Sequence, residues 1–355
     1  MAERRGRPAL VVVGGFLGAG KTTLLLRAAR LLRDRGLRAA VITNDQAGAL
    51  VDTRLASAEG VDSGEVAGAC FCCRFSELTQ VAESLLKVRP DVIFAEPVGS
   101  CIDISATVLQ PLKQFWSGQF RLAPFSVVVD PGRAAELTAE DADPHLAYLF
   151  QKQVAEADIV LFSKGDRFAE VPELPGTAAV RRVSALTGAG VAAWLDEVLS
   201  GQLSAGGHLV DVDYARYAAA EAALGWLNWE GELRLSTGMS PAQVVGPLLE
   251  KLDAELSAAG ARVAHLKVFD RAPTGYIRAG ICANGEEPSV EGDRLASAAR
   301  RHEVVVNLRA RGAPEVLAGC LGRALAVLPV RPRVLLEQCF QPSPPVPEHR
   351  FERVV

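Results

Sequence analysis

The stretch that decides the fold is Gly14-Gly15-Phe16-Leu17-Gly18-Ala19-Gly20-Lys21-Thr22-Thr23. From Gly15 to Thr22 it matches the phosphate-binding pattern G-x-x-x-x-G-K-[ST]. The apolar run 10–13 predicts a buried strand before it, and apolar residues at helical spacing over 24–32 predict a helix after it. Glycines let backbone N–H groups approach phosphate oxygens, and the helix start adds positive potential. We therefore expect a nucleotide-binding loop rather than a glycine-rich turn without a ligand.

In such a loop the lysine reaches the β- and γ-phosphates, and the hydroxyl after it ligates Mg²⁺. We assign these roles to Lys21, which we also treat as catalytic, and to Thr22. The residues of the loop expected to bind nucleotide are Gly15, Gly18, Ala19, Gly20, Lys21, Thr22 and Thr23.

Strand patterns alternate with helix patterns through the first two hundred residues. Further strands are expected at 39–43, 91–96, 125–130, 159–162 and 180–183, and helices at 76–88, 102–115, 145–155 and 191–199. The stretch 131–144 is expected to be mostly loop. This alternation predicts an α/β fold, a P-loop NTPase with a doubly wound, mostly parallel sheet. Ligands of such sheets bind in the loops after the strands.

Acidic residues follow two of these strands. The second strand leads into a polar loop, Asn44-Asp45-Gln46-Ala47-Gly48, which we expect to continue through 50–53. Asp45 and Asp52 are candidates for contact with Mg²⁺ or its waters, and Asp52 is also a candidate catalytic residue. The alternative is that both are solvated loop acids. Glu96 ends the next strand and is expected to bind Mg²⁺ or position water, as catalytic acids of these NTPases do. Gly99 is expected to offer its N–H to the γ-phosphate.

Three cysteines crowd one glycine-flanked segment, Gly68-Ala69-Cys70-Phe71-Cys72-Cys73. Thiolates bind Zn²⁺ and similar ions, and close spacing lets one loop supply several ligands. We predict metal binding by Cys70, Cys72 and Cys73; the alternative is that they are small buried apolar residues. Three thiolates leave a tetrahedral site one ligand short, which suits a carrier or catalyst. Cys101 is expected to pack in the core rather than act as a fourth ligand.

Two later loops carry residues suited to guanine. Asp166 in Ser163-Lys164-Gly165-Asp166 can accept both guanine N–H groups, while the stem of Lys164 covers the base. The loop Ser184-Ala185-Leu186 can present backbone N–H groups to the guanine oxygen. The residues expected to hold the base are Ser163, Lys164, Asp166, Ser184, Ala185 and Leu186.

The pattern changes after a glycine- and serine-rich linker at 201–207. We expect domains at 1–204 and 205–340, the second a smaller α+β domain with a helical piece to 224. Its strands are expected near 227–235 and at 265–269, 276–283 and 303–309, and its helices at 241–259 and 314–325. The proline-rich tail, 341–355, is expected to be extended or disordered. His265 and His302 are expected to be core or surface histidines rather than metal ligands.

Composition narrows the class of protein. The formal net charge of −4 argues against nucleic-acid binding as the main task. Seven cysteines, an odd number, do not form a disulfide framework and suit a reducing compartment. No signal peptide or membrane span is seen in the sequence, so we expect a cytoplasmic protein without membrane contact.

Taken together, the phosphate loop, the Asn44-Asp45 loop with Asp52, the C-x-C-C segment, Glu96-x-x-Gly99 and Ser163-Lys164-Gly165-Asp166 resemble the CobW-like P-loop GTPases. These are relatives of the UreG and HypB metallocentre-assembly GTPases. The resemblance covers the first two hundred residues well and the second domain loosely. It implies slow GTP hydrolysis to GDP, with Mg²⁺, coupled to delivery of Zn²⁺ or Co²⁺ to a client protein or to cofactor assembly, including that of cobalamin. It is also compatible with a homodimer.

This chain departs from the family pattern in three places. The usual Asn-Glu-Phe-Gly-Glu loop is replaced at 44–48, Ser163 stands where Asn is usual, and the histidine-rich stretch of many relatives is missing. Two other functions remain open on the residues alone. One is a GTP-dependent regulatory switch with redox-sensing or structural cysteines. The other is a small-molecule or nucleotide kinase, which the guanine-type loops disfavour.

Overall fold

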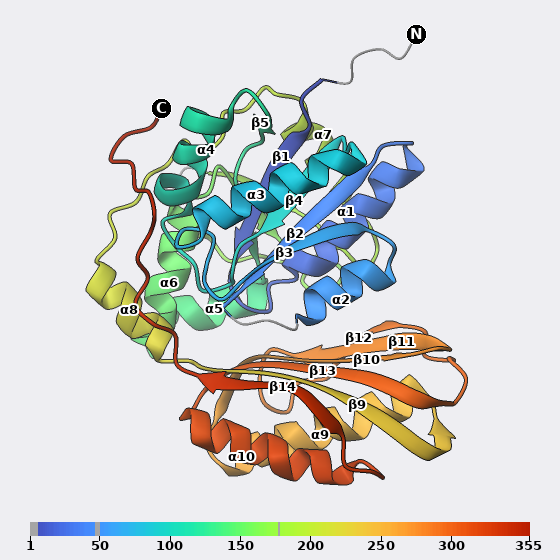
Figure 1. Cartoon of the computed structure of the whole chain (residues 1–355). Coiled ribbons are helices and arrows are strands. Elements are labelled where there is room, and N and C mark those ends of the chain that lie inside the picture. Colours follow the sequence, from blue (N-terminus) through green and yellow to red (C-terminus); the bar gives the residue numbers. More distant parts are fainter. Residues whose placement is uncertain (1–5, 47–49, 177) are drawn as a thin grey trace. The chain divides into compact units, whose positions relative to one another are not determined.

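The computed structural model describes residues 6–46, 50–176 and 178–355 and consists of two units (Figure 1). The first unit comprises residues 6–46, 59–220 and 344–355, and the second comprises 50–58 and 221–343. The sequence-based boundaries, after 204 and after 340, divide the chain differently. The difference arises because 205–220 and the last residues pack with the first unit, whereas 50–58 packs with the second.

The first unit is built on a parallel sheet. In order across it, the strands are β3 (Asp62–Ala67), β2 (Ala39–Asp45), β4 (Val92–Glu96), β1 (Ala9–Gly15), β6 (Ser126–Val129), β7 (Ile159–Phe162) and β8 (Ala179–Arg182). A short strand, β5 (Arg121–Leu122), also pairs with β1. All these pairs are parallel, which confirms the predicted α/β fold. The edge strand β3 was not predicted, because most of its residues are half-buried and polar.

Helices lie on both sides of this sheet (Figure 1). They are α1 (Lys21–Asp34), α3 (Phe75–Leu85), α4 (Gln110–Trp116), α5 (Pro131–Thr138), α6 (Pro144–Ala155), α7 (Val191–Leu199) and α8 (Tyr214–Ala222). A 3₁₀ turn, Leu86–Val88, extends α3, and a π-helical turn, Ser105–Leu109, precedes α4. Side chains of α1 and α7 share one core with alternate residues of β1. The expected loop at 131–144 was wrong over α5, whose first turn Asp130 caps by accepting from the N–H of Gly132 at 2.9 Å.

The second unit is built on an antiparallel sheet. Across it the strands are β12 (Ser289–Gly292), β11 (Gly275–Ile281), β10 (Arg262–Ala272), β13 (Ala299–Arg311), β9 (Gly225–Met239) and β14 (Arg333–Phe340). Its helices are α2 (Val51–Ala58), α9 (Pro241–Ala258), α10 (Pro314–Ala324) and a 3₁₀ turn, Leu325–Val327. Helices α9 and α10 share a core with the sheet, which confirms the predicted smaller α+β domain.

Helix α2 packs on the other face of the same sheet. Val51 lies in a small core with Phe269 and Val305, whereas the neighbouring Val268 and Val304 face the core shared with α9 and α10. Successive strand residues point to opposite faces, so the two sets define two sides of the sheet. The expectation of a loop through residues 50–53 was therefore wrong from Val51 onward.

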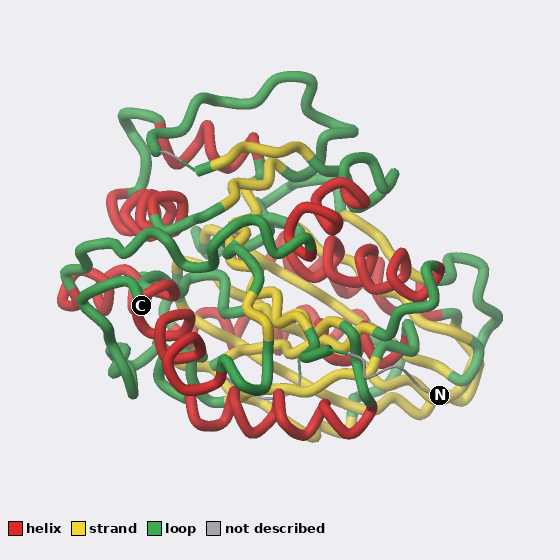
Figure 2. Tube along the Cα trace, turned by 90° about the horizontal axis from the view of Figure 1, so that it is seen from above, coloured by secondary structure: helices red, strands yellow, loops and turns green. Residues whose placement is uncertain are grey.

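The end of the chain, residues 341–355, has no helix or strand and is drawn as loop (Figure 2). It is extended, and its last part runs beside α4 and α8 (Figure 1). Among the residues described, no helix is both long enough and apolar enough to cross a lipid bilayer.

Candidate nucleotide and thiol site

The phosphate loop lies between the end of β1 and the start of α1. Gly15 has a φ of 133°, and a Cβ atom on it would lie 2.3 Å from the carbonyl oxygen of Val128, so no other residue fits this position. The Nζ of Lys21 donates to the carbonyl of Gly15 at 2.8 Å and to that of Phe16 at 3.4 Å. The lysine thus folds back over the loop, where it would meet phosphate oxygens. This strand–loop–helix arrangement is the one expected of a phosphate loop.

Glu96 meets the phosphate loop from the end of β4, the strand beside β1. The hydroxyl of Thr22 donates to Glu96 Oε2 at 2.8 Å and lies 3.1 Å from Oε1. Lys21 Nζ lies 3.9 Å from the same carboxylate, and both side chains are buried. A hydroxyl and a carboxylate oxygen are ligands that Mg²⁺ accepts, so the donor set fits the ion that the fold implies.

Gly99 lies directly against the phosphate loop. A Cβ atom on it would lie 3.0 Å from the backbone nitrogen of Leu17 and 2.8 Å from the Leu17 side chain. Gln153 of α6 fixes this segment by donating to the carbonyls of Gly99 and Cys101, both at 2.9 Å. The absence of a side chain at Gly99 therefore lets the segment after β4 touch the loop. Gln153 had no signal in the sequence.

The other two predicted carboxylates lie in different settings. Asp45 ends β2, and its carbonyl accepts from the N–H of Gly68 at 3.1 Å. Asp52 lies in α2 of the second unit, where Lys267 Nζ is 2.6 Å from both of its oxygens. A role for either carboxylate in Mg²⁺ binding stays a prediction. Ala47 and Gly48 of the predicted loop lie outside the described residues.

The two loops expected to hold guanine come together after the neighbouring strands β7 and β8. The hydroxyl of Ser184 donates to Asp166 Oδ1 and accepts from the N–H of Thr187 at 3.1 Å. Lys164 has a left-handed backbone, φ 54°, and its ammonium is 2.6 Å from Asp130 Oδ2. Such a conformation costs about 1 kcal/mol or more and marks functional loops. Ser163 donates to the carbonyl of Val129, and Ala185 and Leu186 follow Ser184 in the second loop.

Asn44 attaches the cysteine segment to the end of β2. Its side-chain amide donates to the carbonyls of Val66 and Ala69 at 2.9 and 2.8 Å, and its oxygen accepts from the N–H of Phe71 at 2.9 Å. Its neighbour in the chain, Thr43, is in register with Glu96 on β4. The residue that holds the segment therefore directly follows the β2 position paired with Glu96. In the sequence, Asn44 is recognisable only as part of a polar loop, and nothing there signals this anchoring role.

The three predicted thiols form one cluster. The Sγ atom of Cys70 lies 2.8 Å from that of Cys72 and 3.3 Å from that of Cys73, and Cys72 and Cys73 are 3.6 Å apart. Among the described residues, they are the one group of cysteine, histidine and acidic side chains close enough to share a metal ion. Cys101, which was expected to pack in the core, is buried and is not part of this group.

These contacts concentrate thiolate character on one sulfur. Hydrogen bonds from Cys101, Cys72 and Cys73 hold the pKa of Cys70 well below its ordinary value. The bond to Cys70 raises the pKa of Cys72 well above the ordinary value and that of Cys73 to about 12. Of the three sulfurs, Cys70 is therefore the one whose thiolate form the surroundings favour most.

Comparison with known protein families identifies the first unit. The model of the family described as CobW/HypB/UreG, nucleotide-binding domain, matches residues 9–185, from β1 to the second guanine-type loop. Residues 9–185 are a CobW/HypB/UreG nucleotide-binding domain. This confirms the resemblance drawn from the motifs and places the domain among P-loop GTPases.

Solved structures similar to the chain include relatives of the same family. A Zn(II)-bound triple mutant of the YjiA GTPase has 18% identity and a TM-score of 0.37, covering 90% of this chain and 99% of that one. Zn(II)-bound YjiA from E. coli has 17% identity, a TM-score of 0.34 and the same coverage. HypB from Helicobacter pylori in complex with nickel has 17% identity and a TM-score of 0.41, covering 54% of this chain and 86% of that one. None of these similarities assigns an activity to the chain.

The C-terminal tail lies over the cysteine segment of the CobW/HypB/UreG domain. The N–H of Val346 donates to Cys73 Sγ at 3.2 Å, and that of Glu348 donates to the carbonyl of Cys72 at 2.9 Å. The Glu348 carboxylate accepts from the hydroxyl and N–H of Ser76 at 2.6 and 3.1 Å, at the start of α3. Arg350 then pairs with the buried Asp103 at 2.8 Å. The sequence predicted an extended tail but not these contacts.

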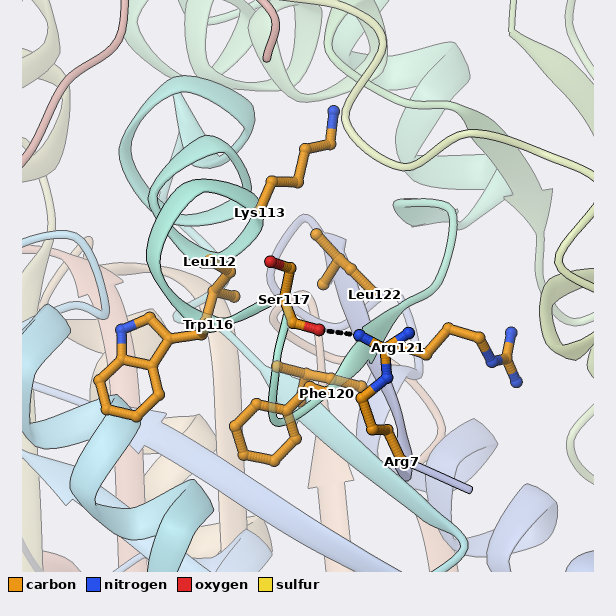
Figure 3. Close-up of a pocket in the computed structure, with 9 residues that line it drawn as sticks. Arg7, Leu112, Lys113, Trp116, Ser117, Phe120, Arg121 and Leu122 are labelled. Carbon is orange, nitrogen blue, oxygen red and sulfur yellow. Dashed lines mark hydrogen bonds between the residues drawn. The ribbon is translucent and has the colours of Figure 1, made fainter. Parts of the chain in front are cut away.

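A pocket of the CobW/HypB/UreG domain lies elsewhere, beside α4 (Figure 3). Its lining residues are Arg7, Leu10, Leu112, Lys113, Trp116, Ser117, Phe120, Arg121 and Leu122. The guanidinium of Arg7 donates to the carbonyl of Ser117 across it. Leu10 is near the start of β1, whereas the phosphate loop follows its end, so this pocket is separate from the nucleotide site.

Proposed function

We propose that the protein binds GTP with Mg²⁺, hydrolyses it slowly, and carries a transition metal, Zn²⁺ or Co²⁺, on Cys70, Cys72 and Cys73. Under nucleotide control it would pass the metal to a client metalloprotein or to cofactor assembly. The observation that carries this proposal is the position of the thiol cluster. Asn44 ties it to the end of β2, beside the strand whose Glu96 contacts the phosphate-loop residue Thr22.

This position supplies a physical route between nucleotide and metal. Lys21, Thr22 and Glu96 would hold the phosphates and Mg²⁺, while Asp166 and Ser184 would read guanine. Nucleotide binding would rearrange the Glu96 and Gly99 contacts with the loop. The segment that bears the thiols is tied to the end of the adjoining strand β2. Nucleotide control requires that the protein bind the metal with different affinity in its GTP and GDP states. By linkage, the bound metal then changes the relative affinity for GTP and GDP by the same factor. A reducing compartment such as the cytoplasm would keep the thiols available.

The test separates the two sites by mutation. In Cys72→Ser, Zn²⁺ affinity should fall by at least about tenfold, whereas GTP affinity and GTP hydrolysis without metal should stay unchanged. Cys282→Ser, in the second unit, serves as the matched control and should change neither. Equal loss of metal and GTP binding in Cys72→Ser would count against a separable metal site. Unchanged Zn²⁺ binding would favour a regulatory GTPase with structural or redox-sensing cysteines.

A further inference from the structure

The three thiols of the cysteine segment differ in how far the domain covers them. Cys70 is 3% exposed and Cys72 is 1% exposed, whereas Cys73 is only half-buried. The N–H of Val346 donates to the Cys73 sulfur at 3.2 Å, so the C-terminal tail lies against the most accessible of the three thiols. A molecule that approaches the cluster from solvent therefore meets Cys73 together with the tail.

Polar and aromatic contacts with α3 and α4 hold the tail in this position. The Glu348 carboxylate accepts from the hydroxyl of Ser76 at 2.6 Å. The next residue, His349, packs its ring against Phe75 of α3 and Phe115 of α4, with centroid distances of 5.2 and 5.8 Å. The tail is therefore attached to the domain through side chains of its own and not only through the contact with Cys73.

An ion pair with a buried acid completes the attachment. Arg350 Nε lies 2.8 Å from Asp103 Oδ2, and Asp103 is 1% exposed. The hydroxyl of Tyr214 in α8 donates to the same oxygen at 2.8 Å. Loss of the cationic partner is costly for a buried carboxylate, because burial keeps water from solvating its charge. The Arg350–Asp103 pair is therefore the contact on which the position of the tail depends most.

Asp103 belongs to the segment that follows β4 and touches the phosphate loop. It comes four residues after Gly99, where a Cβ atom would lie 3.0 Å from the backbone nitrogen of Leu17. The backbone of Asp103 is left-handed, with a φ of 65°, a conformation that the surrounding contacts have to maintain. Movement of this segment with the nucleotide would therefore move the partner of Arg350.

We propose that residues 346–351 form a latch over the metal site, which Arg350 closes on Asp103 and which opens when GTP hydrolysis releases the segment after β4. This rests on the proposed function and deepens it, because it names the step that lets the metal leave. With the latch open, a donor atom of the acceptor bonds to the metal, the metal–sulfur bond of Cys73 breaks, and the freed thiolate takes up a proton from water. With the latch closed, Val346 lies against that sulfur and the metal is retained.

Release of Zn²⁺ from the full-length, reduced protein tests the latch. The Zn²⁺-loaded protein, with Mg²⁺ and either GTP or GDP, is mixed with excess pyridylazoresorcinol, and the coloured zinc complex is followed with time. Release from the wild-type protein should be slower with GTP than with GDP. In Arg350→Ala it should be at least about tenfold faster with GTP, and the difference between the nucleotides should shrink.

A second variant and a control accompany this measurement. Asp103→Asn should act in the same direction as Arg350→Ala. Asparagine tolerates a left-handed backbone and keeps an acceptor for Tyr214, so this variant should retain the fold. Arg353→Ala, at an exposed arginine just beyond the latch, is the matched control and should release Zn²⁺ at the wild-type rate.

A readout without metal distinguishes failure of the latch from failure of the proposed function. In the metal-free protein, alkylation of Cys73 by iodoacetamide should be at least about tenfold faster in Arg350→Ala and Asp103→Asn. Wild-type rates of release and alkylation in both variants would overturn the latch and leave the metal carrier intact. Equal release from the wild-type protein with GTP and GDP would overturn the opening of the latch by hydrolysis. Absence of Zn²⁺ binding by the wild-type protein would overturn both proposals.

Discussion

We expect the carboxylate of Glu96 to set the Mg²⁺ dependence of nucleotide binding, and Glu96→Gln tests this most sharply. Lys21 Nζ lies 3.9 Å from Glu96 Oε1, with side-chain exposures of 7% and 10%. At an effective dielectric constant of ~20, two unit charges at this distance attract by about 4 kcal/mol. If desolvation and residual water cancel two thirds of that attraction, about 1.4 kcal/mol remains, a factor of ten in affinity.

The substitution has opposite effects with and without the ion. Glutamine keeps an oxygen that can accept from Thr22, so the local hydrogen bond survives. Without Mg²⁺, phosphates no longer compete with a carboxylate for Lys21, and nucleotide affinity should rise about tenfold. With Mg²⁺, the ion loses a charged ligand or a charged acceptor for its waters, so affinity and the rate of GTP hydrolysis should fall.

Titration of a fluorescent GTP analogue in excess chelator and in excess Mg²⁺ measures both effects. The dissociation constant in excess chelator divided by that in excess Mg²⁺ should fall by at least about tenfold in Glu96→Gln. Glu140→Gln, an exposed glutamate, is the matched control and should keep the wild-type ratio. An unchanged ratio in Glu96→Gln would refute the placement of Mg²⁺ beside this carboxylate.

Four further predictions follow from contacts in the two units. In Asp52→Asn the buried ammonium of Lys267 loses its partner, so the free energy of unfolding by urea should fall by about 1–3 kcal/mol, less than for a fully buried pair because Asp52 is partly exposed. Burial raises the pKa of Glu156 well above its ordinary value of 4.5, so the folded state holds a proton that the unfolded chain loses above that pH. The stabilising effect is therefore complete below about pH 4.5 and declines as pH rises, and Glu156→Gln should flatten the decrease in urea stability above about pH 4.5. In Asp166→Asn, loss of a charged acceptor for two guanine N–H groups should weaken GTP binding by about 3 kcal/mol, roughly a hundredfold, and favour xanthosine triphosphate in competition binding. Deletion of residues 344–355 removes the N–H donor to Cys73 and should speed alkylation of the cysteine segment by iodoacetamide, followed by mass spectrometry.

Each of these four predictions has a contrary result. If Asp52→Asn left urea stability unchanged but made GTP binding independent of Mg²⁺, Asp52 would act at the nucleotide site and not as the stabilising partner of Lys267. An equally steep pH dependence in Glu156→Gln would show that other groups cause it. Equal GTP binding by Asp166→Asn would remove Asp166 from base recognition. Equal alkylation rates with and without the tail would mean that it does not cover the thiols in solution.

The sequence predicts those parts of the fold that are locally encoded. Strands β1, β4, β6 and β7 are short apolar runs buried on both faces, and these were found with their connecting helices. Strand β3 was missed because an edge strand of sequence Asp-Ser-Gly-Glu-Val-Ala lacks both an apolar run and a clear alternation. Helix α2 was missed because its eight residues carry little helical pattern of their own, and it is held by Phe269 and Val305, far along the chain.

The residues of the candidate site likewise fall into two groups: those with a local sequence signal and those placed by distant contacts. Motif residues such as Lys21, Glu96 and Asp166 were identified because each belongs to a fixed spacing next to a strand. Residues that act through distant contacts gave no such signal. Asn44 holds the cysteine segment by contacts that only the fold creates. The tail likewise reaches Cys73 across most of the sequence.

The central claim is that nucleotide state controls a thiolate metal site, and a Co²⁺ titration of the reduced, full-length protein tests it most directly. Thiolate-to-cobalt absorption is followed first with GTP and Mg²⁺ and then with GDP and Mg²⁺. We expect saturation at one metal per chain, with clearly tighter binding in the GTP state. Equal affinity in both states would contradict nucleotide control, and absence of a thiolate band in both would contradict the metal site itself.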